Sequence, residues 1–204
     1  MSLQTETSPL VLASASSARR AVLEAAGLSF TAEAAYIDET AIKHGAKAEG
    51  LAAGETALIL SELKAQRVSR RHPDALVIGC DQLLVCDGQW FDKPVDLMAA
   101  SEQLIALRGK MHILETALVC MKNEQIIWHH VARPRLTMRP FSDEFLETYL
   151  ALEGDAVLSS VGAYRLEGLG VQLFDAIEGE HSAILGLPLL PLLGFLRQNG
   201  VLVA

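Results

Sequence analysis

The sequence predicts a mixed α/β protein whose β-sheet contains both parallel and antiparallel strands. Short apolar runs alternate with segments of helical spacing along the whole chain, so strands and helices follow one another. The Asp87-Gly88 pair after the apolar run 75–86 is a hairpin signal, which indicates that part of the sheet is antiparallel. With 204 residues the chain fits one domain, residues 1–204, either undivided or in two lobes with boundaries near Gly109 and Pro140.

The alternation of strands and helices is already present in the N-terminal part of the chain. Residues 10–13 form an apolar run typical of a short buried strand, and residues 18–26 have helical spacing that Gly27 ends. Residues 37–39 belong to a segment with no clear element, and Ser142 is placed to cap a helix. The further elements are expected as strands at 30–34, 75–86, 89–91, 112–121, 125–137 and 171–177, and helices at 55–69, 97–107, 143–152 and 188–198.

The composition limits the classes of function. The net charge of −8 excludes a broad basic face for nucleic acid, so an anionic substrate would need a local basic pocket. Cys80, Cys86 and Cys120 show no metal-ligand spacing and have apolar neighbours, which suits reduced core residues in a reducing cytosol. Residues 1–9 lack the features of a signal peptide, and the apolar stretch 183–196 is too short to cross a bilayer. We therefore expect a cytoplasmic protein that binds neither membrane nor nucleic acid.

The serine-rich turn before the first helix is the most informative stretch. Arg19 and Arg20 fall in the first helical turn, where free N–H groups and the helix dipole disfavour cations. A bound anion would offset this cost, and Ser14 and the neighbouring serines supply hydroxyl and amide donors to hold one. The stretch therefore predicts a phosphate-binding turn without the usual glycines. A serine N-cap followed by two solvated arginines is the alternative.

Asp81 and Gln82 interrupt an apolar run that otherwise has the pattern of a strand buried on both faces. A carboxylate buried there without a partner would cost several kcal/mol, so Asp81 must meet a cation, a metal or a cavity. This makes Asp81 the leading catalytic candidate, and a buried aspartate that accepts backbone hydrogen bonds is the alternative. Adjacent strand residues face opposite ways, so Gln82 can share a pocket with Asp81 only at a bulge or a strand end.

Two lysines and an acidic residue are further candidates. Lys64 lies on the apolar stripe of the helix 55–69, where its side chain either reaches out to solvent or points into a site. Lys93 precedes a proline, so an extended backbone presents its side chain; a solvated loop lysine is the alternative. Glu39 could meet only water or, together with Asp81, supply oxygen ligands to Mg²⁺ or Mn²⁺.

The segment 162–170 contains too many glycines for a regular element and predicts a loop that brings backbone close to another group. Glu167 in this loop could read the edge of a nucleobase, and a plain glycine-rich turn is the alternative. The six histidines show no metal-ligand spacing. The sequence has neither a GxSxG nucleophile elbow nor a Walker lysine motif, which disfavours a serine hydrolase and a P-loop enzyme.

These segments together resemble the Maf family of nucleoside triphosphate pyrophosphatases, and the resemblance covers nearly the whole chain. Several motifs in a fixed order are far more specific than any one of them. The resemblance implies an elongated, twisted sheet flanked by helices, forming two lobes around a central cleft, as in the Maf and ITPase folds. The matching segments are LASASSARRAVLEAAGL, IDET, LKAQRV, VIGCDQLLVCDG, FDKP, SVGAYRLEGLG and IEGEHSAILGLPL.

The resemblance also implies roles for individual residues. The family's general base corresponds to Asp81, and Glu39 would share with it the binding of the implied cofactor, a divalent cation. The residues that hold the triphosphate correspond to Ser14, Arg19, Lys64 and Lys93.

The family divides by its preferred nucleobase. Members with an aspartate-threonine pair in the strand and glutamine in the glycine-rich loop are similar to dTTP and UTP pyrophosphatases. Members with aspartate-glutamine and glutamate prefer 7-methyl-GTP, and Gln82 and Glu167 resemble this second type, which implies that both side chains bind the substrate. Ala18 stands where the second type has tryptophan and the first has arginine, which removes a cation–π surface for a methylated, positively charged base.

The sequence and the resemblance lead to one main hypothesis. The chain would hydrolyse a nucleoside triphosphate, including a modified nucleotide such as 7-methyl-GTP, to a monophosphate and pyrophosphate in a house-cleaning role. Asp81 would orient or deprotonate the attacking water. The alternative is a nucleotide-binding regulator of cell division and septum formation with little catalysis. The apolar C-terminal stretch and the resemblance favour a homodimer.

Overall fold

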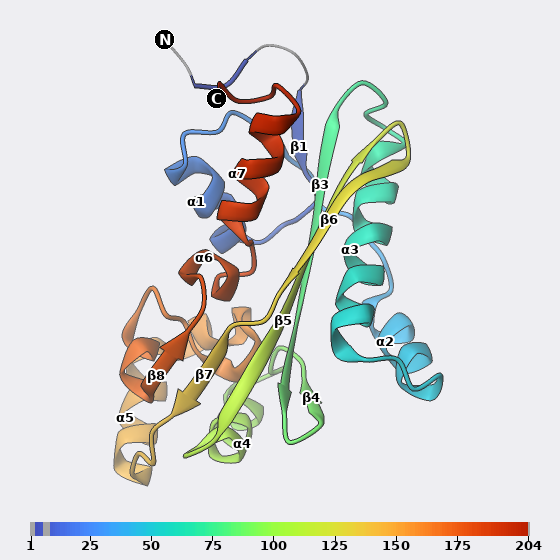
Figure 1. Cartoon of the computed structure of the whole chain (residues 1–204). Helices are drawn as coiled ribbons and strands as arrows, with labels where there is room; N and C mark the ends of the chain where they lie inside the picture. Colours follow the sequence, from blue (N-terminus) through green and yellow to red (C-terminus); the bar gives the residue numbers. More distant parts are fainter. Residues whose placement is uncertain (1–2, 6–8, 204) are drawn as a thin grey trace. The chain divides into compact units, whose positions relative to one another are not determined.

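The computed structural model describes residues 3–5 and 9–203, so the expectation for residues 1–9 falls partly outside the described residues. Helices and strands alternate along the chain as expected (Figure 1). The strands are β1 (Leu10–Leu12), β2 (Thr31–Ala32), β3 (Leu76–Cys86), β4 (Gln89–Phe91), β5 (Met111–Lys122), β6 (Gln125–Ala132), β7 (Arg135–Met138) and β8 (Phe174–Glu178). The α-helices are α1 (Ser17–Ala25), α2 (Glu39–Ala48), α3 (Ala53–Ser69), α4 (Leu97–Leu107), α5 (Asp143–Glu153), α6 (His181–Ile184) and α7 (Leu189–Gln198). Three 3₁₀ helices are η1 (Gly154–Ser159), η2 (Val161–Ala163) and η3 (Leu169–Leu173).

The predicted mixed α/β class is confirmed by the strand pairing. The hydrogen-bonded order is β2-β1-β3-β5-β7-β8, with β4 paired to β3 and β6 paired to β5. β1 runs parallel to both β2 and β3. The β3–β4 pair is the expected hairpin, and β6, β7 and β8 pair with their neighbours in the antiparallel sense.

Two compact units make up the chain. The first comprises Met1–Gln82, Thr116–Ala132 and Glu180–Ala204, and the second comprises Leu83–Glu115 and Arg133–Gly179. The sequence predicted a single domain with two lobes around a central cleft. That prediction concerns how these two units are arranged, and it stays a prediction.

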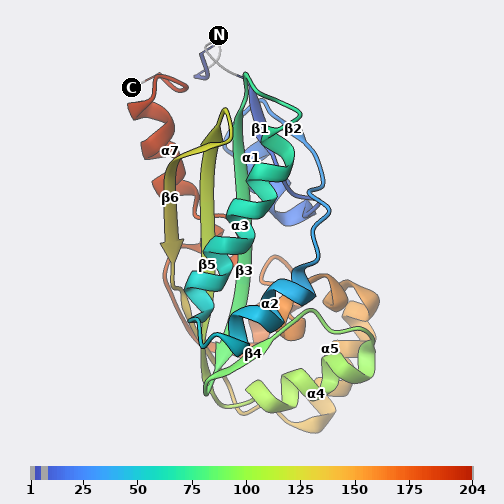
Figure 2. The same ribbon diagram turned by 90° about the vertical axis from the view of Figure 1, so that its right-hand side faces the viewer.

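Side chains of the first unit alternate between two apolar layers, one on each side of the strands. Leu12 and Ile78 belong to a cluster shared with α1 and α7. Val11 and Val77 belong to a second cluster shared with α3. Figures 1 and 2 show α1 and α7 on one side of β1 and β3, with α3 on the other. Because side chains alternate along a strand, the odd-numbered residues of β3 in this unit face α3 and the even-numbered residues face away from it.

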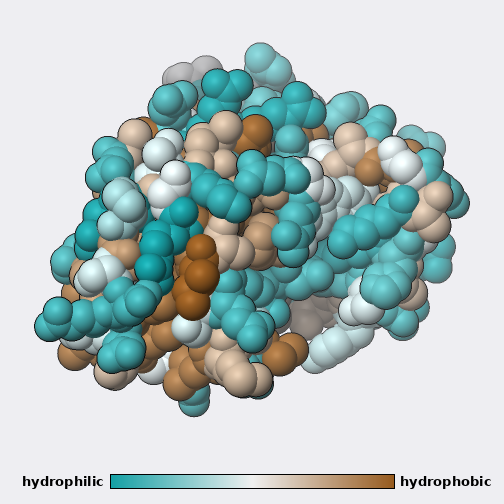
Figure 3. Space-filling view, turned by 90° about the horizontal axis from the view of Figure 1, so that it is seen from below, coloured by the Kyte–Doolittle hydropathy of each residue, from teal (hydrophilic) through white to brown (hydrophobic). Residues whose placement is uncertain are grey.

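The second unit has its own buried aromatic cluster. The ring of His112 lies 5.5 Å from that of Tyr164, and Tyr164 meets Phe174 edge-on at 4.9 Å between ring centroids. Tyr149 donates a hydrogen bond to the carbonyl of Ala163 at 3.2 Å, which ties α5 to η2. On the face seen from below the view of Figure 1, hydrophobic side chains are scattered among hydrophilic ones (Figure 3).

Helix α2 corrects the expectation of no clear element around Glu39. Asp38 caps this helix, since its carboxylate accepts from the backbone N–H of Ala41 at 2.9 Å. Of its ten residues only Ala46 is buried. Without a buried stripe the helix leaves no apolar periodicity in the sequence, and its N-cap was the available signal.

Two of the expected strands differ clearly from those in the structure, and a further helix besides α2 was not expected. The strand expected at 125–137 is two strands, β6 and β7, which are separated around Pro134, a residue without an N–H to donate. The strand expected at 171–177 begins only at Phe174, because the preceding residues form η3. Helix α6 is a single turn and lies in a segment for which no element was expected.

The cysteines are buried in the structure, as expected. Cys80, Cys86 and Cys120 are all buried and free. Burial raises the pKa of the Cys80 thiol to about 11, which keeps it protonated at neutral pH. Within the described residues, none of the helices combines the length and the apolar character that crossing a bilayer requires.

Candidate active site

The serine-rich turn between β1 and α1 is held by its own hydrogen bonds. Ser14 Oγ accepts from the backbone N–H of Ser16 at 3.2 Å. Ser16 Oγ in turn accepts from the backbone N–H of Arg19 at 3.4 Å and so caps α1. No acidic side chain lies in the first turn of α1, so the positive end of this helix dipole has no carboxylate of its own beside it. Such a helix end favours an anion.

The side chain of Arg19 is fixed by hydrogen bonds rather than solvated. Its Nε donates to the carbonyl of Gly186 at 2.9 Å. One terminal nitrogen donates to the carbonyl of Cys80 at 2.8 Å and to Ser14 Oγ at 3.4 Å. A guanidinium has five N–H donors, so these three contacts leave donors for a ligand. The contact with Ser14 also means that this hydroxyl faces cationic and amide donors rather than a base, which disfavours its use as a nucleophile.

Lys64, Asp81 and Glu39 form an ionic cluster in the first unit. Lys64 Nζ makes a short ion pair with Asp81 Oδ1 and a second ion pair, at 2.7 Å, with Glu39 Oε1. Lys64 is 8% exposed and Asp81 is 4% exposed. The buried acid therefore has a cation, as expected, and of the two alternatives for Lys64 the structure has the one in which the side chain points inward.

A close approach between α3 and β3 produces this ion pair. A Cβ at Gly79 would lie 2.1 Å from the carbonyl oxygen of Ser61, so only glycine lets the helix lie this near to the strand. Ser61 Oγ also donates to the carbonyl of Ala117 on β5 at 3.1 Å. Lys64 lies almost one helical turn beyond Ser61, and Asp81 lies two residues beyond Gly79 on the same side of the strand. The register of helix on strand therefore brings the two charges together.

Asp81 and Gln82 point to opposite sides of β3, as strand geometry predicts. Asp81 meets α3 through Lys64. Gln82 Nε2 donates to Thr116 Oγ1 at 2.8 Å and to the carbonyl of Ala183 at 3.0 Å. The two neighbouring side chains therefore lie in different environments.

The cations around Glu39 keep its carboxylate charged. Partial burial works to raise its pKa, but the charge and hydrogen bond of the Lys64 ammonium lower it. The charges of Lys43 and Arg19 act in the same direction, so the pKa of Glu39 lies below its ordinary value. Arg19 also donates to the carbonyl of Cys80, the residue before Asp81, so the arginine turn reaches the strand that carries the buried acid.

The donor set fits a divalent cation that is bound together with a polyphosphate. Asp81 Oδ2 is buried and has no hydrogen-bond partner among the described residues, so one carboxylate oxygen is left for a ligand. Residues 3–5 and 9–203 contain no cluster of three or more histidine, cysteine or acidic side chains that could hold a metal alone. Mg²⁺ commonly uses one or two carboxylates and takes its other ligands from phosphate and water. Glu39 and Asp81 can supply that number.

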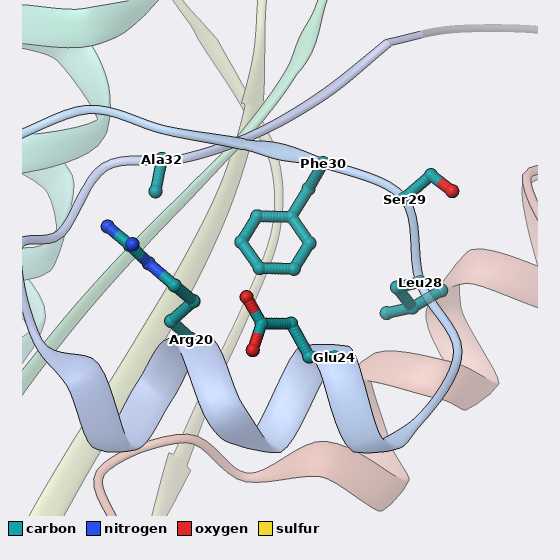
Figure 4. Close-up of a pocket in the computed structure, with 6 residues that line it drawn as sticks. All are labelled: Arg20, Glu24, Leu28, Ser29, Phe30 and Ala32. Carbon is teal, nitrogen blue, oxygen red and sulfur yellow. The ribbon is translucent and has the colours of Figure 1, made fainter.

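Arg20 is exposed. It lines a pocket of about 470 Å³ between α1 and the segment before β2, together with Glu24 and Phe30 (Figure 4). The structure thus separates the two neighbouring arginines, with Arg19 turned inward and Arg20 exposed. Ala18 is partly exposed in the first turn of α1.

Lys93 and Glu167 belong to the second unit. Lys93 is exposed just after β4. Glu167 pairs with Arg165 Nε at 3.2 Å, and Arg165 also contacts Glu153 at 3.5 Å. Their expected contact with substrate stays a prediction.

Three residues beside these groups have roles that were not predicted from the sequence. Gly79 sets the approach of α3, and the carbonyl of Gly186 orients Arg19. Thr116 is fully buried and bonds Gln82. A glycine within a buried apolar strand was a readable signal for a close backbone approach, whereas the other two act through contacts between distant segments.

The fold and the site define a mixed α/β protein in which an arginine from the start of a helix contacts the strand that carries a lysine-paired buried acid. The model of the Maf-like protein family matches residues 9–199, and the chain belongs to this family. A nucleoside triphosphate pyrophosphatase of Granulibacter bethesdensis is 58% identical over 193 residues, which cover 95% of this chain and 98% of that protein. One of Rhodospirillum rubrum is 53% identical, covering 96% of this chain and 97% of that protein. A 7-methyl-GTP pyrophosphatase of Rhizobium meliloti is 48% identical over 195 residues, covering 96% of this chain and 98% of that protein.

Proposed function

We propose that this chain is a nucleoside triphosphate pyrophosphatase that hydrolyses the bond between the α- and β-phosphates and gives a monophosphate and pyrophosphate. The observation that carries the proposal is the buried Asp81, which is paired with Lys64 through one oxygen and has its other oxygen unpartnered among the described residues. Relatives at 48–58% identity over nearly the full chain, which are named for this activity, support it.

The geometry suggests a separate role in the hydrolysis for each residue of the site. Oδ1 of Asp81 is held by Lys64, so Oδ2 is the oxygen that can accept a proton from the attacking water. The water oxygen bonds to the α-phosphorus, the bridging P–O bond breaks and pyrophosphate leaves. Arg19 has free donors to stabilise the charge that builds up on the phosphates, and Ser14 and the start of α1 bind a phosphate beside it. Glu39 and Asp81 would hold a divalent cation, Mg²⁺ or Mn²⁺, with Asp81 reaching it through the attacking water so that Oδ2 stays available for the proton, and the cation would polarise the α-phosphate.

Glu167 is the residue that we propose for recognition of the nucleobase. The relatives include 7-methyl-GTP pyrophosphatases, and Glu167 carries the carboxylate that a guanine edge would require. Ala18 offers no aromatic surface for a methylated base, so we propose a purine triphosphate without fixing its modification. We also propose that the protein acts as a homodimer in the cytoplasm, where the nucleotide pool supplies its substrate.

The test is pyrophosphate release from a panel of triphosphates that includes 7-methyl-GTP, GTP, dTTP, UTP and CTP, with Mg²⁺ or Mn²⁺ present. Asp81→Asn is expected to lower kcat at least about a hundredfold while nucleotide binding is retained. Lys64 keeps Glu39 as a partner in this variant, so the fold should persist. Asp175→Asn removes an exposed aspartate of β8 and serves as the matched control.

The same panel separates an enzyme from a regulator. A nucleotide sensor that acts on septum formation would bind triphosphates without releasing pyrophosphate, and it would not depend on the carboxylate of Asp81. Full turnover in Asp81→Asn would exclude this residue as the general base. No release by the wild type from any triphosphate would exclude the proposed activity itself.

A further inference from the structure

Gln82 uses its amide donors entirely within the protein. Its Nε2 donates to Thr116 Oγ1 at 2.8 Å and to the carbonyls of Ala183 and Ile184 at 3.0 and 3.1 Å. An amide nitrogen carries two hydrogens, so these three acceptors saturate it. Thr116 Oγ1 donates in turn to the carbonyl of Ala183 at 3.1 Å. Gln82 therefore has no free donor with which to read a nucleobase.

The two carbonyls that Gln82 binds belong to the C-terminal end of α6. Carbonyls at a helix end lack partners within the helix, and a helix of one turn depends on outside contacts to keep its position. Gln82 and Thr116 supply those contacts from β3 and β5. The link therefore fixes where the chain leaves α6.

Gly186 lies two residues after the end of α6 and binds Arg19. Its carbonyl accepts from Arg19 Nε at 2.9 Å. Its φ of +92° is a conformation that favours glycine, and a Cβ there would lie 2.9 Å from Arg19 Nε. The second backbone acceptor of Arg19 is the carbonyl of Cys80, two residues before Gln82 on β3. The guanidinium is thus held between β3 and the turn after α6, and Gln82 joins these two segments.

We propose that Gln82 and Thr116 are positioning residues that act through Gly186 on Arg19. They hold the end of α6 against the strands, so that the Gly186 carbonyl fixes the plane in which Arg19 presents its remaining donors to the polyphosphate. This inference rests on the proposed function, and it gives Gln82 a role other than the substrate contact that the family resemblance implies.

The first test removes the link without changing side-chain shape. Thr116→Val keeps the shape of the side chain but loses the hydroxyl, and Gln82→Met keeps its length but loses the amide. Both are expected to lower kcat between about 10- and 100-fold, by a common factor for every triphosphate in the panel, because a displaced Arg19 meets phosphate and not base. Thr116→Ser restores the hydroxyl and should recover kcat to within about twofold. Thr148→Val, which removes a hydroxyl bonded to a helix carbonyl on the exposed side of α5, is the matched control.

The second test asks whether the effect passes through Arg19. In an Arg19→Met background, neither Gln82→Met nor Thr116→Val should lower kcat further, because residues that act through one group are not additive. Gly186→Ala interrupts the same chain of contacts outside the strands, and it should show the same loss alone and no further loss with Arg19→Met. Because Gly186 lies on neither strand, this variant still tests the positioning role if a substitution on β3 or β5 prevents folding.

The outcomes separate this inference from the activity on which it rests. Additive losses in the Arg19→Met background would overturn the positioning role, and so would a Gln82→Met variant that changes the order of preference among nucleobases. If the wild type releases no pyrophosphate, the proposed function fails. The same double-mutant cycle is then measured as the affinity for inorganic triphosphate by calorimetry, where non-additivity supports the inference and additivity overturns it.

Discussion

At the scale of single residues, the ion pair of Lys64 and Asp81 should be the most sensitive point of the site. Lys64→Met leaves the buried carboxylate of Asp81 without its cation, which is expected to cost about 3–5 kcal/mol of unfolding free energy and to abolish turnover. Urea unfolding measures this loss. Lys110→Met removes one partner of the exposed pair with Asp87 and should cost less than about 1 kcal/mol. Equal losses in the two variants would contradict the buried character of the pair.

His112 gives the second unit a predictable response to acid. It is fully buried, its Nε2 lies 2.8 Å from the Tyr164 hydroxyl, and burial lowers its pKa to about 4. Between pH 6.5 and pH 4, His112 therefore binds a proton in the unfolded chain but stays neutral in the folded chain. As a result, the free energy of unfolding falls as the pH falls through this window. His112→Gln should reduce that slope by about 1.4 kcal/mol per pH unit, measured by urea unfolding at several pH values. Parallel slopes for the wild type and the variant would show that His112 is not buried in its neutral form.

At the scale of elements, the contact of α3 with β3 decides whether the site forms. Gly79→Ala places a methyl group against the carbonyl of Ser61, so α3 must move outward and carry Lys64 away from Asp81. The expected result is a loss of about 1–3 kcal/mol of stability together with a fall in kcat. Gly194→Ala, in the middle of α7 with open space around it, is the control and should stabilise the helix by up to about 1 kcal/mol. A fully active Gly79→Ala would show that the register of α3 is not set at this glycine.

The same elements show how far the sequence could predict the structure. β1 and β3 follow from their apolar runs, and Asp81 follows as the acid within the run of β3. Helix α2 could not be predicted from periodicity, because it buries only Ala46. The pairing of Lys64 with Asp81 could not be derived from spacing, since it depends on how a helix lies on a strand 17 residues away.

The role of Gln82 shows the same limit for polar contacts. Its side was predictable from strand alternation, but its partners on α6 and β5 lie 34 to 102 residues away in the sequence. Short polar segments such as α6 take their position from such contacts rather than from their own pattern.

At the scale of the whole molecule, the net charge of −8 means that binding of an anionic nucleotide depends on a few local cations. A triphosphate analogue with a non-hydrolysable methylene bridge between the α- and β-phosphates should therefore stabilise the folded protein. At 100 times its Kd the expected gain is about 2.7 kcal/mol, seen as a rise in Tm. Arg19→Met should reduce this rise, because it removes free donors from the phosphate-binding turn. Arg67→Met, which removes an exposed basic side chain in the last turn of α3, should leave the rise unchanged. A rise of equal size in all three proteins would mean that the nucleotide binds elsewhere, and the assignment of the turn between β1 and α1 would fail.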